Sequence, residues 1–224
     1  MRGALITIYG INNLGKTTHA TILAKNLEKL GLKVKLIKYP IYDIEPSGTF
    51  LNSVIRSEKQ NMTEEELQLW YVINRYQYQA ELERLLNDGF IVIAEDYSGT
   101  GIAWGITKGL DEKWIIDANK YLINPDLAIL FEGKRMLSAK EKIHIHEQND
   151  ELMEKCREVH VHLAEKFGWV RMLIEGTINN SAKKLWSIVE IFLVSNGYLD
   201  MDRKGAGLKS EKMLSSKEFE ILES

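Results

Sequence analysis

The sequence of 224 residues predicts an α/β fold in three layers, with a parallel sheet of five strands flanked by helices. Two observations predict it. Short apolar runs rich in β-branched residues alternate along the chain with longer segments whose apolar residues recur at helical spacing. A glycine-containing loop also stands between the first apolar run and the first helical segment, which is an arrangement typical of α/β proteins that bind phosphates.

The first strand is predicted over residues 4–9, and a helix follows from Lys16 until Gly31 ends it. Residues 10–17 between them read GINNLGKT and fit the pattern G-x-x-x-x-G-K-[ST], which predicts a P-loop NTPase fold. Backbone N–H groups of such a loop, together with the helix N-terminus, face anionic oxygens. The expected nucleotide-binding residues are Gly10, Asn12, Asn13, Leu14, Gly15, Lys16, Thr17 and Thr18. Lys16 would reach the β- and γ-phosphates, and the Thr17 hydroxyl would hold Mg²⁺.

A second strand is predicted over residues 33–38, and it ends in Lys38-Tyr39-Pro40, where the proline stops regular structure. Residues 41–49 are expected to form a loop at the carboxyl end of that strand. Ligands dock at this end of the strands in parallel α/β folds. The loop is therefore either a plain connection or a substrate loop, and its place beside the phosphate loop makes the second interpretation at least as good.

A long helix is predicted from Thr63, whose neighbours Glu64, Glu65 and Glu66 form a capping box and an acidic first turn, to about Asn87. Tyr71 and Arg75 are four residues apart and so share one face of it. Most pairs at this spacing are ordinary packing. The sharper interpretation is an aromatic face that stacks a base beside a guanidinium that binds a phosphate.

The most apolar strand is predicted over residues 90–94, and Glu95 and Asp96 follow it. Acidic residues directly after a buried strand, in a chain with a phosphate loop, suggest a role in holding Mg²⁺ directly or through water. Residues 97–109 read as a turn into a short helix that shapes a pocket. A helix at 111–122 and a strand at 127–131 are expected next.

Residues 133–150 are basic and lack an apolar period, so they form either a solvated loop or a lid that closes over phosphates. A helix at 147–167, a strand at 169–174 and a helix at 181–194 complete the expected fold. We predict one nucleotide-binding domain over residues 1–195, and a poorly packed polar tail over 196–224.

Net charge, cysteine content and the length of the apolar runs exclude several classes of function. The formal net charge of −3 argues against a dedicated nucleic-acid binder. The single cysteine, Cys156, rules out an internal disulfide and suits a reducing cytoplasm, where we expect the protein. The chain enters its first strand without a signal peptide, and no apolar run approaches transmembrane length, so no membrane association is expected.

Several separate stretches together resemble the thymidylate kinase family, whose members are P-loop nucleoside monophosphate kinases. The resemblance spans about residues 3–193 and is carried by an ordered set of motifs rather than by the phosphate loop alone. These are the opening strand and loop, KYP at 38–40, EPSGT at 45–49, YVINRY at 71–76, EDY at 95–97, TGIAW at 100–104 and NPDLAIL at 124–130.

The resemblance implies roles for the matched residues. Tyr71 would stack on thymine, and Arg75 would bind the dTMP phosphate and the base edge. Trp104 would crowd the sugar and disfavour a ribose 2′-hydroxyl, and Glu95 would take the carboxylate position near Mg²⁺. The implied substrate-binding set is Lys38, Tyr39, Pro40, Tyr71, Arg75, Tyr97, Thr100, Gly101 and Trp104. The implied catalytic set is Lys16, Arg75, Lys134 and Arg135, the last two at the start of the lid.

Three positions depart from the family pattern. Asp96 stands where the family has an arginine, Asn12 where its phosphate loop has a carboxylate, and Ile44 where bacterial members have an arginine. Neutralisation of the phosphates must then come from Lys16, Arg75, Lys38 and the lid. The sequence is therefore interpreted as a divergent member of the family.

The resemblance implies transfer of the ATP γ-phosphoryl group to dTMP with Mg²⁺, in a homodimer. Two alternatives stay open at this point. One is another deoxynucleoside monophosphate kinase, or one of broad specificity. The other is a nucleotide-binding switch ATPase without a small acceptor, suggested by the acid at Asp96.

Overall fold

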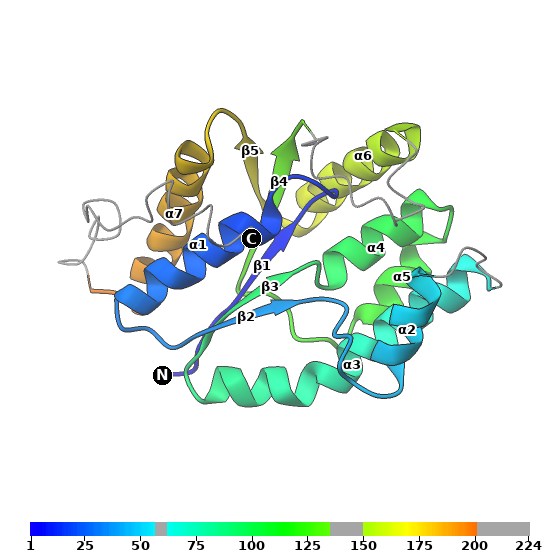
Figure 1. The fold of residues 1–224 in the computed structure, drawn as a ribbon, viewed down its shortest axis with the longest axis horizontal. Coiled ribbons are helices and arrows are strands. Elements are labelled where there is room, and N and C mark those ends of the chain that lie inside the picture. Colours follow the sequence, from blue (N-terminus) through cyan, green and yellow to red (C-terminus); the bar gives the residue numbers. More distant parts are fainter. Residues whose placement is uncertain (57–61, 135–149, 201–224) are drawn as a thin grey trace.

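The computed structural model describes residues 1–56, 62–134 and 150–200. Its centre is a sheet of five parallel strands in the order β2-β3-β1-β4-β5 (Figure 1). The strands are β1 (Leu5–Tyr9), β2 (Val34–Lys38), β3 (Ile91–Glu95), β4 (Leu127–Gly133) and β5 (Val170–Ile174). The predicted fold class, including the number of strands, is confirmed.

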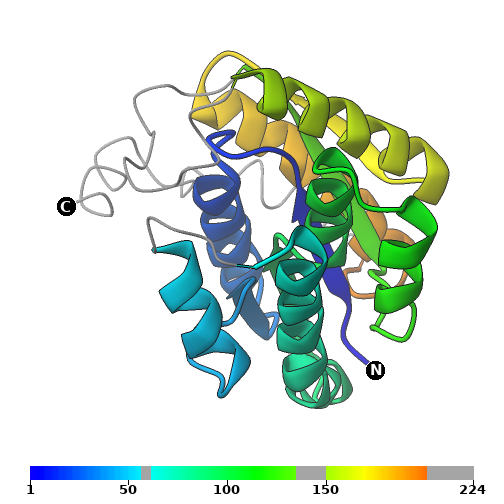
Figure 2. The same ribbon diagram turned by 90° about the vertical axis from the view of Figure 1, so that its right-hand side faces the viewer.

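Helices cover both faces of this sheet and give the three expected layers (Figures 1 and 2). Within the described residues they are α1 (Lys16–Lys29), α2 (Ser47–Ile55), α3 (Glu64–Asn87), α4 (Ser98–Thr107), α5 (Glu112–Asn119), α6 (Asp150–Phe167) and α7 (Ile178–Ser195). One face packs mainly on α1 and α7, and the other on α3 and α6. The helices α2 and α4 pack on α3, and α5 packs on α3 and α4.

The central strands are apolar on both faces because both faces are covered. Every residue of β1 and β3 is buried, and Leu5 pairs in register with Val92 while Ile6 pairs with Leu127. Since all strands run in parallel, their carboxyl ends meet at one edge of the sheet. That edge therefore brings together the phosphate loop after β1, Lys38 at the end of β2, and Glu95 at the end of β3.

The prediction of a loop over residues 41–49 is wrong from Ser47 onward, where α2 begins. This helix depends on tertiary contacts rather than on its own periodicity. Phe50 packs on Trp70 of α3, with ring centroids 4.3 Å apart, and the buried Asn74 of α3 donates a hydrogen bond to Ser47 Oγ. A Cβ atom on Gly48 would lie 2.4 Å from the Tyr42 carbonyl oxygen, so the turn into α2 needs a glycine.

The packed chain extends beyond the expected boundary at residue 195. Leu199 is 6% exposed and belongs to the core that α1 and α7 cover. Tyr198 stacks on Phe192, and its hydroxyl donates a hydrogen bond to the Gly3 carbonyl oxygen at 3.3 Å. The rest of the predicted tail, residues 201–224, lies outside the described residues.

No helix in the described part of the chain is long and apolar enough to cross a membrane.

Candidate active site

The loop between β1 and α1 adopts the backbone conformation that its glycines permit. Gly10 has φ 131°, and a Cβ atom there would lie 2.6 Å from the Phe131 carbonyl oxygen. Gly15 has φ 74°, and Asn13 also lies in the left-handed region with φ 64°. The side-chain nitrogen of Asn13 is buried without a hydrogen-bond partner among the described residues. Such an unpaired donor is costly in a protein interior, and it fits a loop that binds an anion.

The Lys16 side chain, 6% exposed, lies folded back on this loop. Its Nζ donates hydrogen bonds to the carbonyl oxygens of Gly10 at 2.8 Å and Ile11 at 3.0 Å, and it lies 3.3 Å from Asp96 Oδ1. Asp96 also accepts a hydrogen bond from the Thr100 hydroxyl at 3.2 Å. The acid that replaces the family's arginine thus pairs with the lysine of the phosphate loop.

The Thr17 hydroxyl and the Glu95 carboxylate meet at the sheet edge. Thr17 Oγ1 donates a hydrogen bond to Glu95 Oε2 at 2.8 Å, and Lys38 Nζ lies 3.4 Å from the same hydroxyl. Burial raises the pKa of Glu95, while the Thr17 hydrogen bond opposes this and the Asp96 charge adds to it. The two residues predicted to hold a metal, Thr17 and Glu95, are therefore in contact. The neighbouring Asp96 instead contacts Lys16.

Arg75 is 4% exposed and lies against α4, where α3 and α4 approach closely. A Cβ atom on Gly101 would lie only 2.1 Å from Arg75 Nη2, so the guanidinium occupies the space that a glycine leaves. Its Nη1 donates a hydrogen bond to Asn119 Oδ1 at 3.3 Å. Burial lowers the pKa of Arg75, and the nearby hydroxyls of Tyr97 and Tyr39 act in the opposite sense.

Polar atoms without partners gather around this guanidinium. Arg75 Nε and the hydroxyls of Tyr39 and Tyr97 are buried, and none has a hydrogen-bond partner in the described residues. The two tyrosine rings are adjacent, with centroids 5.0 Å apart. Tyr9, the residue before the phosphate loop, is also a neighbour of Arg75. Buried polar groups normally find partners, so this set indicates a place for a polar ligand.

Three more of the predicted substrate residues lie on α3, on α4 and at the end of β2. Tyr71 lies one turn before Arg75 on α3, and burial raises the pKa of its hydroxyl. Trp104 lies one turn after Thr100 on α4 and is half-buried against the main core. Pro40 follows Tyr39 across a cis peptide bond at the end of β2. Tyr71 and Arg75 thus share a face, as the sequence predicted; their roles stay predictions.

Two supporting side chains escaped the sequence analysis. Asn74 is fully buried and exchanges hydrogen bonds of 2.8 Å with both the N–H and the carbonyl oxygen of Ile41. It therefore ties the loop after β2 to α3. Asn119, the partner of Arg75, is fixed by its own bond to the Ile115 carbonyl oxygen at 2.8 Å. Asn119 can be recognised only from its hydrogen bond to Arg75, because nothing in its local sequence distinguishes it from a surface asparagine.

Behind the phosphate loop, His160 of α6 is 1% exposed. Its Nδ1 lies 2.8 Å from the Cys156 carbonyl oxygen, and its Nε2 has no partner within the described residues. Burial lowers the pKa of His160 to about 4, with the charge of Lys16 acting in the same sense. The sequence analysis gave this histidine no role. Of the expected lid, Lys134 is exposed at the carboxyl end of β4, whereas Arg135 and residues 136–149 lie outside the described residues.

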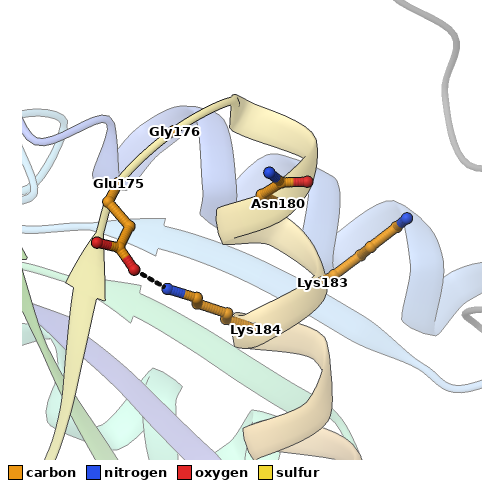
Figure 3. A pocket seen from close by; sticks show the side chains of 5 residues that line it. All are labelled: Glu175, Gly176, Asn180, Lys183 and Lys184. Atoms are coloured by element: carbon orange, nitrogen blue, oxygen red, sulfur yellow. Dashed lines mark hydrogen bonds and ion pairs between the residues drawn. The ribbon is translucent and has the colours of Figure 1, made fainter.

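A pocket that the sequence analysis did not identify lies where β5 leads into α7, at the same sheet edge (Figure 3). Its volume is about 540 Å³, and it is lined by Glu175, Gly176, Asn180, Lys183 and Lys184. Lys184 Nζ forms an ion pair with Glu175 Oε1 at 2.5 Å across the pocket.

The family model described as thymidylate kinase matches residues 8–185 of the chain. The chain belongs to the thymidylate kinase family. The match includes the phosphate loop, the α3 face with Tyr71 and Arg75, and the end of β3, which are the parts that the sequence analysis used. A member of this family is a phosphotransferase of the nucleoside monophosphate kinase class, which confirms the predicted enzyme class.

Individual thymidylate kinases agree with this assignment. A protein named "Probable thymidylate kinase" from Pyrococcus horikoshii is 31% identical over 183 residues, which cover 77% of this chain and 88% of that protein. The thymidylate kinase of Brachyspira hyodysenteriae is 25% identical over 178 residues, covering 72% and 85%. A solved structure of thymidylate kinase from Candida albicans superposes with a TM-score of 0.75 at 24% identity, covering 85% of this chain and 92% of that one, which supports the fold.

Proposed function

We propose that the chain transfers the γ-phosphoryl group of Mg-ATP to dTMP, giving dTDP and ADP. One observation supports the proposal: two sets of polar groups suited to anions lie near one sheet edge. The first is the phosphate loop with Lys16, and the second is the buried Arg75 with the unpaired hydroxyls of Tyr39 and Tyr97. A phosphotransferase needs a set for the donor and a set for the acceptor, aligned with each other.

On the donor side, the N–H groups of the phosphate loop and the N-terminus of α1 would bind the ATP phosphates. Lys16 would exchange its contacts with Gly10, Ile11 and Asp96 for phosphate oxygens. Its positive charge would then stabilise the negative charge on the phosphoryl group that is transferred. Lys134 and Arg135 would add lid cations once both substrates are bound, since a closed lid also excludes water.

The residues present fit a magnesium ion. The Thr17 hydroxyl and the Glu95 carboxylate are oxygen ligands whose oxygens already lie 2.8 Å apart. Mg²⁺ prefers such ligands and keeps several waters and phosphate oxygens in its shell. We propose that Thr17 and Glu95 hold Mg²⁺, directly or through water. When bound, the ion would neutralise charge on the donor phosphates.

On the acceptor side, Arg75 would bind the monophosphate of dTMP through its fork of donors, and Asn119 would keep the guanidinium in place. Tyr71 would stack on the base, and Trp104 would limit space at the sugar. No general base is required, because the second pKa of a phosphate monoester is about 6 and the acceptor is largely ionised at neutral pH. Catalysis would consist of alignment and charge stabilisation.

The proposal is tested by ADP release from Mg-ATP with purified protein, with dTMP, dUMP, dCMP and dGMP added one at a time. Strong stimulation by dTMP is expected. Stimulation by a different monophosphate would retain the phosphotransferase reaction and change its substrate. Slow ATP hydrolysis that no monophosphate stimulates would contradict the proposal and favour a switch ATPase.

We further propose a cytoplasmic homodimer. The family resemblance implies the dimer, and α3 carries two exposed apolar side chains, Leu69 and Ile73, at 42% and 41% exposure. The buried free thiol of Cys156 suits a reducing compartment. Light scattering coupled to size exclusion measures the mass directly, and a monomer at micromolar concentration would refute the dimer.

A further inference from the structure

Three contacts follow one another along the line where α3 packs on α4. Nearest the sheet, the Arg75 guanidinium lies over Gly101. Farthest from it, Lys108 Nζ forms an ion pair with Glu64 at 2.5 Å. Between them lies Gln68, whose Cγ would be 3.7 Å from a Cβ atom on Gly105. The contacts of Arg75 and of Lys108 each involve a charged side chain with a polar partner. The contact of Gln68 involves an uncharged side chain.

Gln68 is 3% exposed, and its Oε1 has no hydrogen-bond partner among the described residues. A buried amide oxygen left without a partner costs about 1–3 kcal/mol, so such groups are rare unless a ligand or water completes them. Glutamine has a high entropy cost of burial as well. A leucine would fill the same place with no polar atom to leave unpaired and with a smaller entropy cost.

The separation between Gln68 and Arg75 along α3 matches the distance from the phosphate to the base of a nucleotide. Seven residues of helix, or about 10 Å, separate the two positions, and both are on one face. The C-terminal end of α3 leads back into β3 at the amino edge of the sheet, so α3 runs toward that edge (Figure 1). Gln68 precedes Arg75 on this helix and therefore lies farther from the amino edge. A monophosphate at Arg75 would therefore direct its base toward Gln68.

Tyr71 and Gln68 are three residues apart and hence neighbours on the helix surface. The Tyr71 ring can stack on the face of a base while the Gln68 amide forms hydrogen bonds with the edge of the same base. A primary amide offers one acceptor and two donors. The edge of thymine or uracil offers the N3–H donor flanked by two carbonyl oxygens, which is the complementary pattern.

We propose that Gln68 is a specificity-determining residue that reads the edge of the pyrimidine base, with Oε1 accepting the N3–H and Nε2 donating to a ring carbonyl oxygen. The inference rests on the proposed function, since it assigns the base of the same acceptor. It predicts that the enzyme recognises the shared edge of dTMP and dUMP, apart from any contact with the thymine methyl group.

The test compares Gln68→Met, which keeps the length of the side chain but removes both hydrogen-bonding groups, with Glu65→Gln at an exposed position of the same helix. In Gln68→Met, KM for dTMP and KM for dUMP should rise together by roughly tenfold, the effect of one to two hydrogen bonds, with KM for Mg-ATP unchanged. Glu65→Gln should match the wild type in all three.

A second variant, Gln68→Glu, keeps an acceptor and loses the donor. It should bind dTMP more weakly than the wild type and gain relative activity on dCMP, whose exocyclic amine is a donor. An unchanged KM for dTMP in Gln68→Met would overturn the inference. So would a rise in KM for dTMP and Mg-ATP alike with a lowered melting temperature, because that is the result of a purely structural role.

The wild-type control separates this inference from the proposed function. If wild-type protein phosphorylates dTMP and Gln68→Met does so with the same KM, only the role of Gln68 is refuted. If no monophosphate stimulates ADP release by the wild type, the proposed function fails, and the base-reading role fails with it.

Discussion

The Lys16 ammonium group is fully engaged within the protein. It contacts two carbonyl oxygens of the phosphate loop and the carboxylate of Asp96. Nucleotide binding must exchange these contacts for phosphate oxygens, so the same side chain supports the loop before binding and neutralises charge after it. Asp96 has φ 55°, a left-handed conformation that aspartate adopts more readily than most residues, and this conformation directs it toward Lys16.

Replacing this lysine tests its role directly. Lys16→Ala should lower kcat for ADP release at least about 100-fold, as the loss of a preorganised charge does elsewhere, while the protein stays folded. Asp96 would still have the Thr100 hydroxyl as a partner. Lys29→Ala, in the last turn of the same helix, is the control and should leave kcat unchanged. A Lys16→Ala protein with normal turnover would refute the assigned donor site.

His160 gives the protein a specific acid sensitivity. The groups that face it are the Cys156 carbonyl oxygen and thiol, with Lys16 and Asp96 nearby. Burial and the Lys16 charge disfavour its protonated form and lower its pKa from 6.5 to about 4. The unfolded state therefore binds more protons than the folded state between these two values, and stability decreases as the pH falls through that range.

The contribution of His160 to this loss should be about 3 kcal/mol of unfolding free energy between pH 6.5 and pH 4. His160→Leu removes the titrating group, so its urea-unfolding free energy should depend less steeply on pH across this range than that of the wild type. Parallel curves for wild type and His160→Leu would contradict the assignment.

At the scale of elements, α3 organises the acceptor side. It carries Tyr71 and Arg75, ties down the loop after β2 through Asn74, and supports α2 through Trp70. Its close approach to α4 depends mainly on Gly101, because a Cβ atom there would lie 2.1 Å from Arg75 Nη2, whereas one on Gly105 would meet side-chain carbons at 3.3 Å. A substitution at Gly101 therefore changes the site by displacing Arg75 rather than by removing a contact.

Gly101→Ala should displace the Arg75 guanidinium, because the new Cβ atom would lie 2.1 Å from Nη2. We expect KM for dTMP to rise roughly tenfold or more while KM for Mg-ATP changes little, since charge-assisted hydrogen bonds are each worth about 1.5–3 kcal/mol. Gly105→Ala is the matched control, because its nearest atoms would be side-chain carbons at 3.3 Å, which can adjust. Equal kinetics in the two variants would show that Arg75 is not constrained by α4.

At the scale of the whole molecule, residues far apart in the chain close the core at the amino edge of the sheet. Leu199 is buried beneath α1 and α7, and Tyr198 reaches the Gly3 carbonyl oxygen. The chain after α7 therefore belongs to the packed domain at least as far as Leu199.

Leu199→Ala should lower the unfolding free energy by about 2–4 kcal/mol, the cost of removing a buried leucine side chain and leaving a cavity. Urea denaturation measures the difference. Ile191→Ala serves as the control, because Ile191 lies on α7 but is 59% exposed, and its loss should cost under about 0.5 kcal/mol. A change in Leu199→Ala as small as that in Ile191→Ala would show that the segment after α7 is not part of the core.

Elements with strong local patterns were predicted well. The phosphate loop, its flanking strand and helix, and the long α3 helix all lie where the sequence placed them, within a residue or two at each end. The α2 helix was missed because its start is fixed by contacts with α3 and by the Gly48 turn, not by its own period. The partnership of Asp96 with Lys16 was also unforeseen, since both residues were considered only as ligands of nucleotide and metal.

Local patterns in the sequence are enough to predict the fold class, the donor loop and the face that carries Tyr71 and Arg75, because periodicity and loop chemistry act over a few neighbouring residues. The side chains that complete the site are known only from the packed fold: Asp96 beside Lys16, Asn119 beside Arg75 and Gln68 over Gly105. Those contacts join residues 37 to 80 positions apart. Asp96 meets Lys16 because β1 and β3 are neighbours in the sheet. The other two contacts depend on how closely helices pack, and that distance is set by glycines and buried side chains acting together rather than by any local pattern.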